Sequence, residues 1–154
     1  MTETEKGLKY MQLLKEAAAL LDGETDMIAN MANLAALIHE SMGFWWTGFY
    51  IVRTGSDGEE QLVLGPFQGP IACTRITYGR GVCGSSWKRR ETIIVPDVEQ
   101  FTGHIACSSE SRSEIVVPVF HDETVTAVLD IDSRRLNTFD ETDARYLEQI
   151  TRLL

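Results

Sequence analysis

The sequence places its three cysteines, Cys73, Cys83 and Cys107, in Gly-rich or polar segments and outside its apolar periodic runs. Core cysteines usually belong to such runs, so inert packing is a weaker explanation, although it stays open. The chain has no C-x-x-C pair, but two loop thiols can cooperate if the fold brings them within disulfide reach. One thiolate then attacks a substrate and the second resolves the product, so thiol redox chemistry is one interpretation.

A zinc site formed by Cys73, Cys83, His104 and Cys107 is another interpretation. Structural zinc sites prefer cysteines two to four residues apart, whereas nine residues separate Cys73 from Cys83. Residues 79–84 read GRGVCG, which matches the dinucleotide-binding pattern G-x-G-x-x-G. That motif requires a preceding strand and a βαβ setting, which this sequence does not predict, so we expect a turn with positive φ instead.

Three carboxylates form a second candidate group. Asp130 and Asp132 alternate with apolar residues in a predicted strand, so their side chains share one face, roughly 6.5–7 Å apart. Glu114 begins the predicted partner strand and joins the same face if the hairpin loop holds an odd number of residues. Three neighbouring carboxylates repel, so one of them tends to keep its proton near neutral pH. A solvated outer face is the alternative explanation.

Two aromatic residues belong with these acids. Trp46, Gly48 and Tyr50 fall on one face of the predicted strand 47–52 and the residue before it. An aromatic pair near an acid cluster suits a small cationic or amphiphilic ligand. These residues therefore indicate a ligand pocket.

Helices and hairpins must position these groups. Hairpins in place of βαβ units predict an antiparallel sheet with helices packed on it, an α+β architecture. We expect Thr25 and Thr138 to cap two of the helices. The expected helices cover 3–21, 25–42, a short stretch after Gly84, and 139–154; the expected strands cover 47–52, 61–67, 92–96, 114–120 and 124–132; the expected long loops cover 68–81 and 97–113. The core faces of the second hairpin are expected to be Ile115, Val117 and Val119 and, on the partner strand, Ala127, Leu129 and Ile131.

Length and charge limit the classes of function. A chain of 154 residues fits one compact domain. A net charge of −9 disfavours both nucleic acid and an anionic membrane surface as partners. The N-terminus lacks an apolar secretory segment, and the odd number of cysteines fits a reducing, cytoplasmic setting.

Five ordered motifs together resemble the free methionine-(R)-sulfoxide reductases, which are single GAF domains. The motifs are GPFQGPIAC (65–73), GRGVCG (79–84), GHIAC (103–107), SEIVVPV (113–119) and VLDIDS (128–133), and WTGFY (46–50) extends the match. The resemblance covers nearly the whole chain. It implies a six-stranded antiparallel sheet flanked by helices, in one GAF domain over residues 1–154.

The resemblance also implies a role for each candidate residue. Cys107 would be the catalytic cysteine and Cys73 the resolving cysteine, with Cys83 beside the pocket as a support or substitute. The substrate would be lined by the carboxylates Glu114, Asp130 and Asp132 and enclosed by the aromatic residues Trp46 and Tyr50. Ser108 follows Cys107 where many relatives carry an acid, which is the main departure from the family pattern.

The implied reaction is reduction of free methionine (R)-sulfoxide to methionine through a Cys107 sulfenic acid and a Cys107–Cys73 disulfide. Thioredoxin, kept reduced by NADPH and its reductase, would recycle the disulfide, with no metal or organic cofactor. The residues leave the oligomeric state open, a homodimer included. A small-molecule sensor of the GAF class is the alternative function, and a zinc-stabilised interaction domain is the third.

Overall fold

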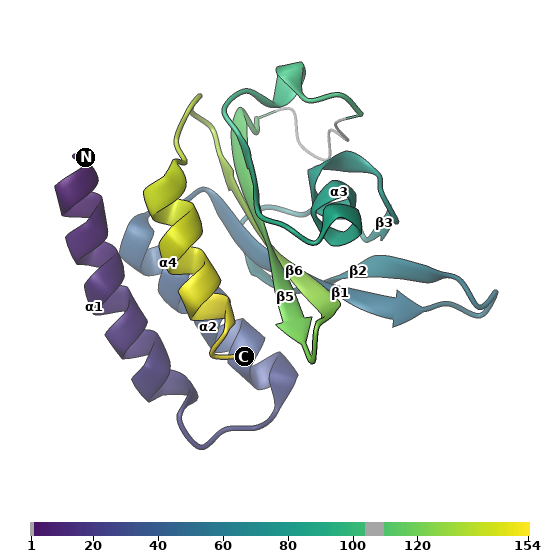
Figure 1. The fold of residues 1–154 in the computed structure, drawn as a ribbon, viewed down its shortest axis with the longest axis horizontal. Coiled ribbons are helices and arrows are strands. Elements are labelled where there is room, and N and C mark those ends of the chain that lie inside the picture. Colours follow the sequence, from purple (N-terminus) through teal and green to yellow (C-terminus); the bar gives the residue numbers. More distant parts are fainter. Residues whose placement is uncertain (1, 104–109) are drawn as a thin grey trace.

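The computed structural model describes residues 2–103 and 110–154. Within these residues, four α-helices and six strands form an α+β arrangement (Figure 1). The helices are α1 (Glu3–Leu21), α2 (Met27–Met42), α3 (Gly81–Arg89) and α4 (Glu141–Thr151), with a short 3-10 turn η1 (Val98–Gln100); the strands are β1 (Trp46–Thr54), β2 (Glu60–Gln68), β3 (Arg75–Thr77), β4 (Ile93–Val95), β5 (Ser113–His121) and β6 (Thr124–Ser133).

The strands form one six-stranded antiparallel sheet in the order β3-β2-β1-β6-β5-β4. This confirms the expected fold class and both expected hairpins, β1–β2 and β5–β6. The expectation that 68–81 forms one irregular loop is wrong, because Arg75–Thr77 pairs with β2 at the sheet edge. Three residues are too few for a periodic signal, so only pairing with β2 reveals this strand.

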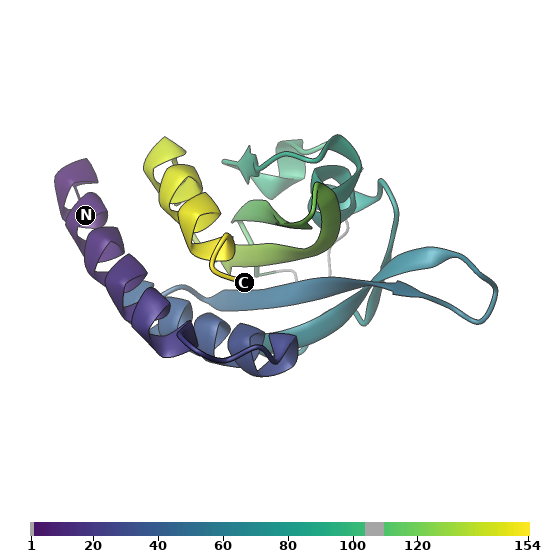
Figure 2. The same cartoon turned by 60° about the horizontal axis from the view of Figure 1, so that its bottom comes forward.

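Helices α1, α2 and α4 cover one face of the sheet, whereas α3 lies on the other (Figures 1 and 2). The first face is sealed by a core that contains Phe49 of β1 and the expected apolar residues of β5 and β6. Those residues are Ile115, Val117, Val119, Ala127, Leu129 and Ile131, all at most 2% exposed. Their alternation sends the intervening side chains, including the carboxylates, to the α3 face.

Two helices begin later than expected, because aspartates cap them in place of threonines. Asp26 accepts a hydrogen bond from Ala29 N at 2.9 Å and begins α2. Asp140 accepts from Thr142 N at 3.0 Å and forms a capping box with Asp143, so α4 starts at Glu141. Both residue types are good caps, and sequence alone does not rank neighbouring candidates.

Helix α3 begins at Gly81, four residues before the start expected at Ser85, just after Gly84. The GRGVCG motif therefore supplies both the turn and the first helical turn. Gly79 and Gly81 have φ of 77° and 63°, as expected for a turn that needs positive φ. Among the described residues, no helix is long and apolar enough to cross a membrane.

Candidate active site

The register of three neighbouring strands collects the predicted pocket residues. Asp132 of β6 pairs with Trp46 of β1 on one side and with Glu114 of β5 on the other. Asp130, two residues before Asp132 in β6, pairs with Gly48, and its side chain lies on the same face of the sheet as that of Asp132. The sheet thus places the acid group and the aromatic strand next to each other, as the same-face argument predicted.

A β-bulge sets this register. The tip of the β5–β6 hairpin holds two residues, Asp122 and Glu123, both with positive φ. An even loop alone would place Glu114 on the opposite face from the aspartates. Between Val119 and Phe120 of β5 the pairing shifts, so that Thr126 of β6 is passed over and one residue is added. The bulge supplies the odd count, and Glu114 faces Asp132.

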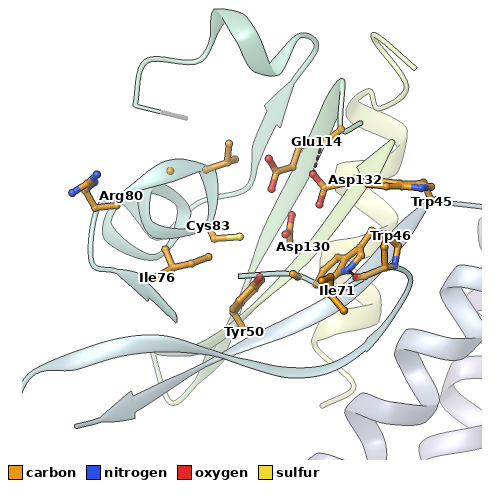
Figure 3. Close-up of a pocket in the computed structure, with 15 residues that line it drawn as sticks. Trp45, Trp46, Tyr50, Ile71, Ile76, Arg80, Cys83, Glu114, Asp130 and Asp132 are labelled. Atoms are coloured by element: carbon orange, nitrogen blue, oxygen red, sulfur yellow. Dashed lines mark hydrogen bonds between the residues drawn. The ribbon is translucent and has the colours of Figure 1, made fainter. Parts of the chain in front are cut away.

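Helix α3 closes the pocket opposite the sheet (Figure 3). Its first turn brings Cys83 against the acids: a sulfur of Cys83 and carboxylate oxygens of Glu114 and Asp130 all lie within 4.8 Å of one another. All three residues are buried. The pocket is lined by Trp45, Trp46, Tyr50, Pro70, Ile71, Ala72, Ile76, Arg80, Gly81, Val82, Cys83, Ser111, Glu114, Asp130 and Asp132.

The aromatic wall is built on Trp46. Its ring stacks on Tyr50 with centroids 6.1 Å apart and on Phe67 at 5.3 Å. A Cβ at Gly48 would lie 2.6 Å from the Trp46 ring and 2.4 Å from Phe67 Cβ, so only glycine leaves room for this stack. The neighbouring Trp45 also lines the pocket, together with Trp46.

Cys73 lies in segment 69–74, between β2 and β3, and is half-buried. Its neighbours Pro70, Ile71 and Ala72 line the pocket, although Cys73 itself does not. Cys73 is disulfide-bonded, whereas Cys83 is a free, buried thiol. Cys107 and His104 lie outside the described residues, so their expected placement, and the proposed zinc set that includes them, stay predictions.

Burial and mutual repulsion dominate the electrostatics. Burial, followed by the charges of Asp130 and Asp132, raises the pKa of Glu114 well above its ordinary value. Burial and Asp130 likewise raise the pKa of Asp132, against a hydrogen bond from Ser111 that lowers it. Burial, Asp130 and Glu114 raise the pKa of the Cys83 thiol. The pocket therefore favours protonated carboxylic acids near neutral pH.

Cys83, Glu114 and Asp130 are also the described residues with the geometry to hold a cation. A larger groove, of about 750 Å³, lies between the helical layer and the β6–α4 connection and includes Lys6, His39 and Arg135. It contains none of the predicted site residues. The chemistry predicted from the sequence thus concentrates in the pocket under α3.

Sequence reasoning missed several residues of the site. Ser111 donates a hydrogen bond to Asp132 Oδ1 at 2.7 Å, yet it sits in a polar segment without any periodic signal. Ile71, Ile76 and Arg80 line the pocket from segments expected to be an irregular loop. These residues can be identified as pocket residues only from the structure, in which the β2–β3 segment packs near α3.

Comparisons with known proteins agree with this architecture. A GAF domain family model matches residues 24–154. The chain is similar to "GAF domain-containing protein A" of Dictyostelium discoideum, at 55% identity over 99% of this chain and 96% of that protein. It is similar to the free methionine-R-sulfoxide reductase of Escherichia coli, at 43% identity over 92% of this chain and 83% of that protein.

Among solved structures, the free methionine-R-sulfoxide reductase of Neisseria meningitidis in complex with its substrate superposes with a TM-score of 0.91. That protein is 51% identical and the match covers 96% of this chain and 87% of the other. The identity, the coverage and the GAF match together show that the chain belongs to the free methionine-(R)-sulfoxide reductase family of GAF domains.

Proposed function

We propose that this protein reduces free L-methionine (R)-sulfoxide to methionine, acting as one GAF domain over residues 1–154. The observation that carries the proposal is the buried pocket in which Glu114, Asp130 and Asp132 face the aromatic wall. The Escherichia coli relative carries this activity in its name, and the Neisseria meningitidis structure holds its substrate.

The pocket is chemically suited to a zwitterionic sulfoxide. An ionised member of the acid group can bind the α-ammonium of the amino acid. The first turn of α3 offers N–H groups that helices leave without an intrahelical partner, which favour a carboxylate. Trp46 and Tyr50 supply apolar surface for the side chain. A free amino acid fits this arrangement better than a residue inside a polypeptide, because both of its charged ends find a complement.

The reaction begins with Cys107. Its thiolate attacks the sulfoxide sulfur, and a protonated carboxylic acid of the pocket donates to the sulfoxide oxygen, which becomes the better leaving group. The raised pKa values of Glu114 and Asp132 make either of them a fitting donor. The resulting hydroxyl then moves from the methionine sulfur to the Cys107 sulfur while the S–S bond between Cys107 and the substrate breaks, so methionine is released and Cys107 is oxidised to a sulfenic acid.

Cys73 completes the cycle. Its sulfur attacks the Cys107 sulfenic acid, the S–O bond breaks, an S–S bond forms and water leaves. An external dithiol, which we assign to thioredoxin, then reduces the disulfide by exchange, with electrons from NADPH. Cys83 takes a supporting place beside the acids, because a buried thiol with a raised pKa is a poor nucleophile. The cycle requires no metal or organic cofactor, and its reductant belongs to a cytoplasmic setting.

The test is turnover of the (R) epimer of free methionine sulfoxide against the (S) epimer, with thioredoxin, thioredoxin reductase and NADPH. We expect turnover of the (R) form alone, abolished by Cys107→Ser. Cys73→Ser should release about one methionine per protein and then stop, since sulfenic acid is not resolved. Turnover of neither epimer by reduced, folded protein would contradict the proposal and favour a small-molecule sensor.

A further inference from the structure

Two aromatic residues of β1 anchor the segment that carries Cys73. We propose that Trp46 and Tyr50 are positioning residues for Cys73, holding segment 69–74 through their polar atoms and thereby setting the rate of disulfide formation. This inference rests on the proposed function, because it concerns the resolving step. It adds to these residues a role distinct from enclosing the substrate.

Two hydrogen bonds carry the proposal. The indole Nε1 of Trp46 donates to the carbonyl oxygen of Pro70 at 2.9 Å. The hydroxyl of Tyr50 donates to the carbonyl oxygen of Cys73, also at 2.9 Å. Both acceptors belong to the backbone of the same six-residue segment, one near its start and the other at the cysteine itself. The aromatic pair therefore fixes where the Cys73 backbone lies.

The entry to the segment is fitted to Trp46 as well. Gly69 has a φ of 129°, and a Cβ there would lie 2.7 Å from Trp46 Cδ1 and 3.0 Å from the carbonyl oxygen of Trp45. The chain thus passes against the indole in a conformation that favours glycine. At the exit, Leu64 N of β2 donates to the carbonyl oxygen of Thr74 at 2.9 Å.

Burial is limited between these anchors, because only Ala72 and Cys73 of the segment are partly buried and the other four residues are exposed. The side chain of Ile71 is 91% exposed at the mouth of the pocket, beside Trp46 (Figure 3). Trp46 and Tyr50, in contrast, are 4% and 2% exposed and stacked on each other, so they are rigid donors. Burial raises the pKa of Tyr50 far above its ordinary value, which keeps its hydroxyl a donor across the working pH range. Besides the disulfide that Cys73 carries in this structure, the two hydrogen bonds are therefore the specific contacts that position its backbone.

Position matters because the resolving step is an intramolecular reaction between two sulfurs. The Cys73 sulfur must approach the Cys107 sulfenic acid along the S–O bond that breaks, while its proton and the hydroxyl leave as water. Small displacements of a reacting group are costly in such steps. The Tyr50 hydroxyl, which donates to the Cys73 carbonyl oxygen, therefore affects the rate of disulfide formation. The Tyr50 ring, in contrast, affects substrate binding.

Tyr50→Phe separates the two roles, because it keeps the ring and deletes only the hydroxyl. In rapid-quench experiments with (R)-sulfoxide, we expect disulfide formation to slow by about three- to ten-fold, the value of one lost hydrogen bond. The methionine-forming step should slow less. Tyr78→Phe is the matched control, because Tyr78 is about half exposed and does not line the pocket. Trp46→Phe should act in the same direction through Pro70.

A second arm does not depend on the sulfoxide reaction. Hydrogen peroxide oxidises thiols directly, so disulfide formation at Cys73 after a peroxide pulse should also slow in Tyr50→Phe, and amide exchange in 69–74 should quicken. If the wild-type protein makes no methionine, the proposed function fails, and this arm still decides the positioning role. Equal rates of disulfide formation in Tyr50→Phe and Tyr78→Phe, or an equal loss in both chemical steps, would overturn the inference.

Discussion

Asp143 and the three pocket carboxylates lie on opposite sides of the same sheet and have opposite electrostatic environments. On the helical face, Asp143 of α4 is 1% exposed and receives a hydrogen bond from Lys6 at 2.7 Å and another from the Tyr10 hydroxyl at 2.5 Å. On the pocket face, Glu114 and Asp132 are held near Asp130, and their pKa values are raised by burial and by that neighbouring charge.

The difference distinguishes an acid with a structural role, Asp143, from the pocket acids, which have a role in the proposed reaction. Asp143 joins α1 to α4, and Lys6 also contacts Asp140, so a cation and a phenol compensate its burial. Glu114 and Asp132 are more stable in their protonated forms, because burial and the neighbouring charge raise their pKa values. A protonated acid is the proton donor that sulfoxide reduction requires. Asp143 is thus compensated within the fold, whereas we expect the pocket acids to lower stability near neutral pH while serving the proposed reaction.

The largest expected effect is on activity. Glu114→Gln removes one candidate proton donor while keeping the shape of the side chain, and we expect kcat/KM for the (R)-sulfoxide to fall by about 100-fold or more. Glu60→Gln, at an exposed position of β2, is the control and should leave kcat/KM unchanged. Near wild-type activity in Glu114→Gln would assign the proton donor to the aspartates.

The second effect is on stability. Lys6→Met leaves the buried Asp143 without its cation, and we expect unfolding in urea to show a loss of about 3 kcal/mol. The kcat of the folded fraction should be retained, because Lys6 lies on the far face of the sheet. Lys15→Met, exposed on the same helix, is the control. A loss no larger than that of the control would make the Lys6–Asp143 pair dispensable.

A smaller effect is expected at the aromatic wall. Gly48→Ala forces a Cβ against Trp46 and Phe67, so we expect a loss of about 1–3 kcal/mol in stability and a raised KM. Gly7→Ala has open space around its Cβ in α1 and should instead be neutral or stabilising. Thermal unfolding and steady-state kinetics of both variants check this. Equal behaviour of the two would show that the wall tolerates displacement.

Only the pocket side of this comparison could be predicted from sequence, because alternation in β6 alone places Asp130 and Asp132 on the face opposite Leu129 and Ile131. The placement of Glu114 was conditional on loop parity, and the condition is met by the bulge at Thr126 and not by the turn.

What sequence could not show depends on contacts between distant segments. Strand β3 forms by pairing with the edge of β2. Ser111 belongs to the site because its hydroxyl donates a hydrogen bond to Asp132. The tether from Tyr50 to Cys73 joins residues 23 positions apart through a backbone carbonyl, which leaves no pattern of residue types. Periodicity predicts on which face of a strand a side chain lies, but it does not predict contacts between segments that are distant in the sequence.

The most direct test of the central claim is the free energy of unfolding as a function of pH, compared between the wild-type protein and Glu114→Gln. A carboxyl whose pKa is raised by folding binds its proton more tightly in the folded state. Its stabilising effect is therefore full below the unfolded pKa of about 4 and is lost as pH rises through the folded pKa. The account predicts that wild-type stability declines from about pH 4 toward neutrality, by at most about 1.4 kcal/mol per pH unit and per group, and that Glu114→Gln weakens the decline. An identical pH dependence in both proteins, or a steeper decline in the variant, would contradict it.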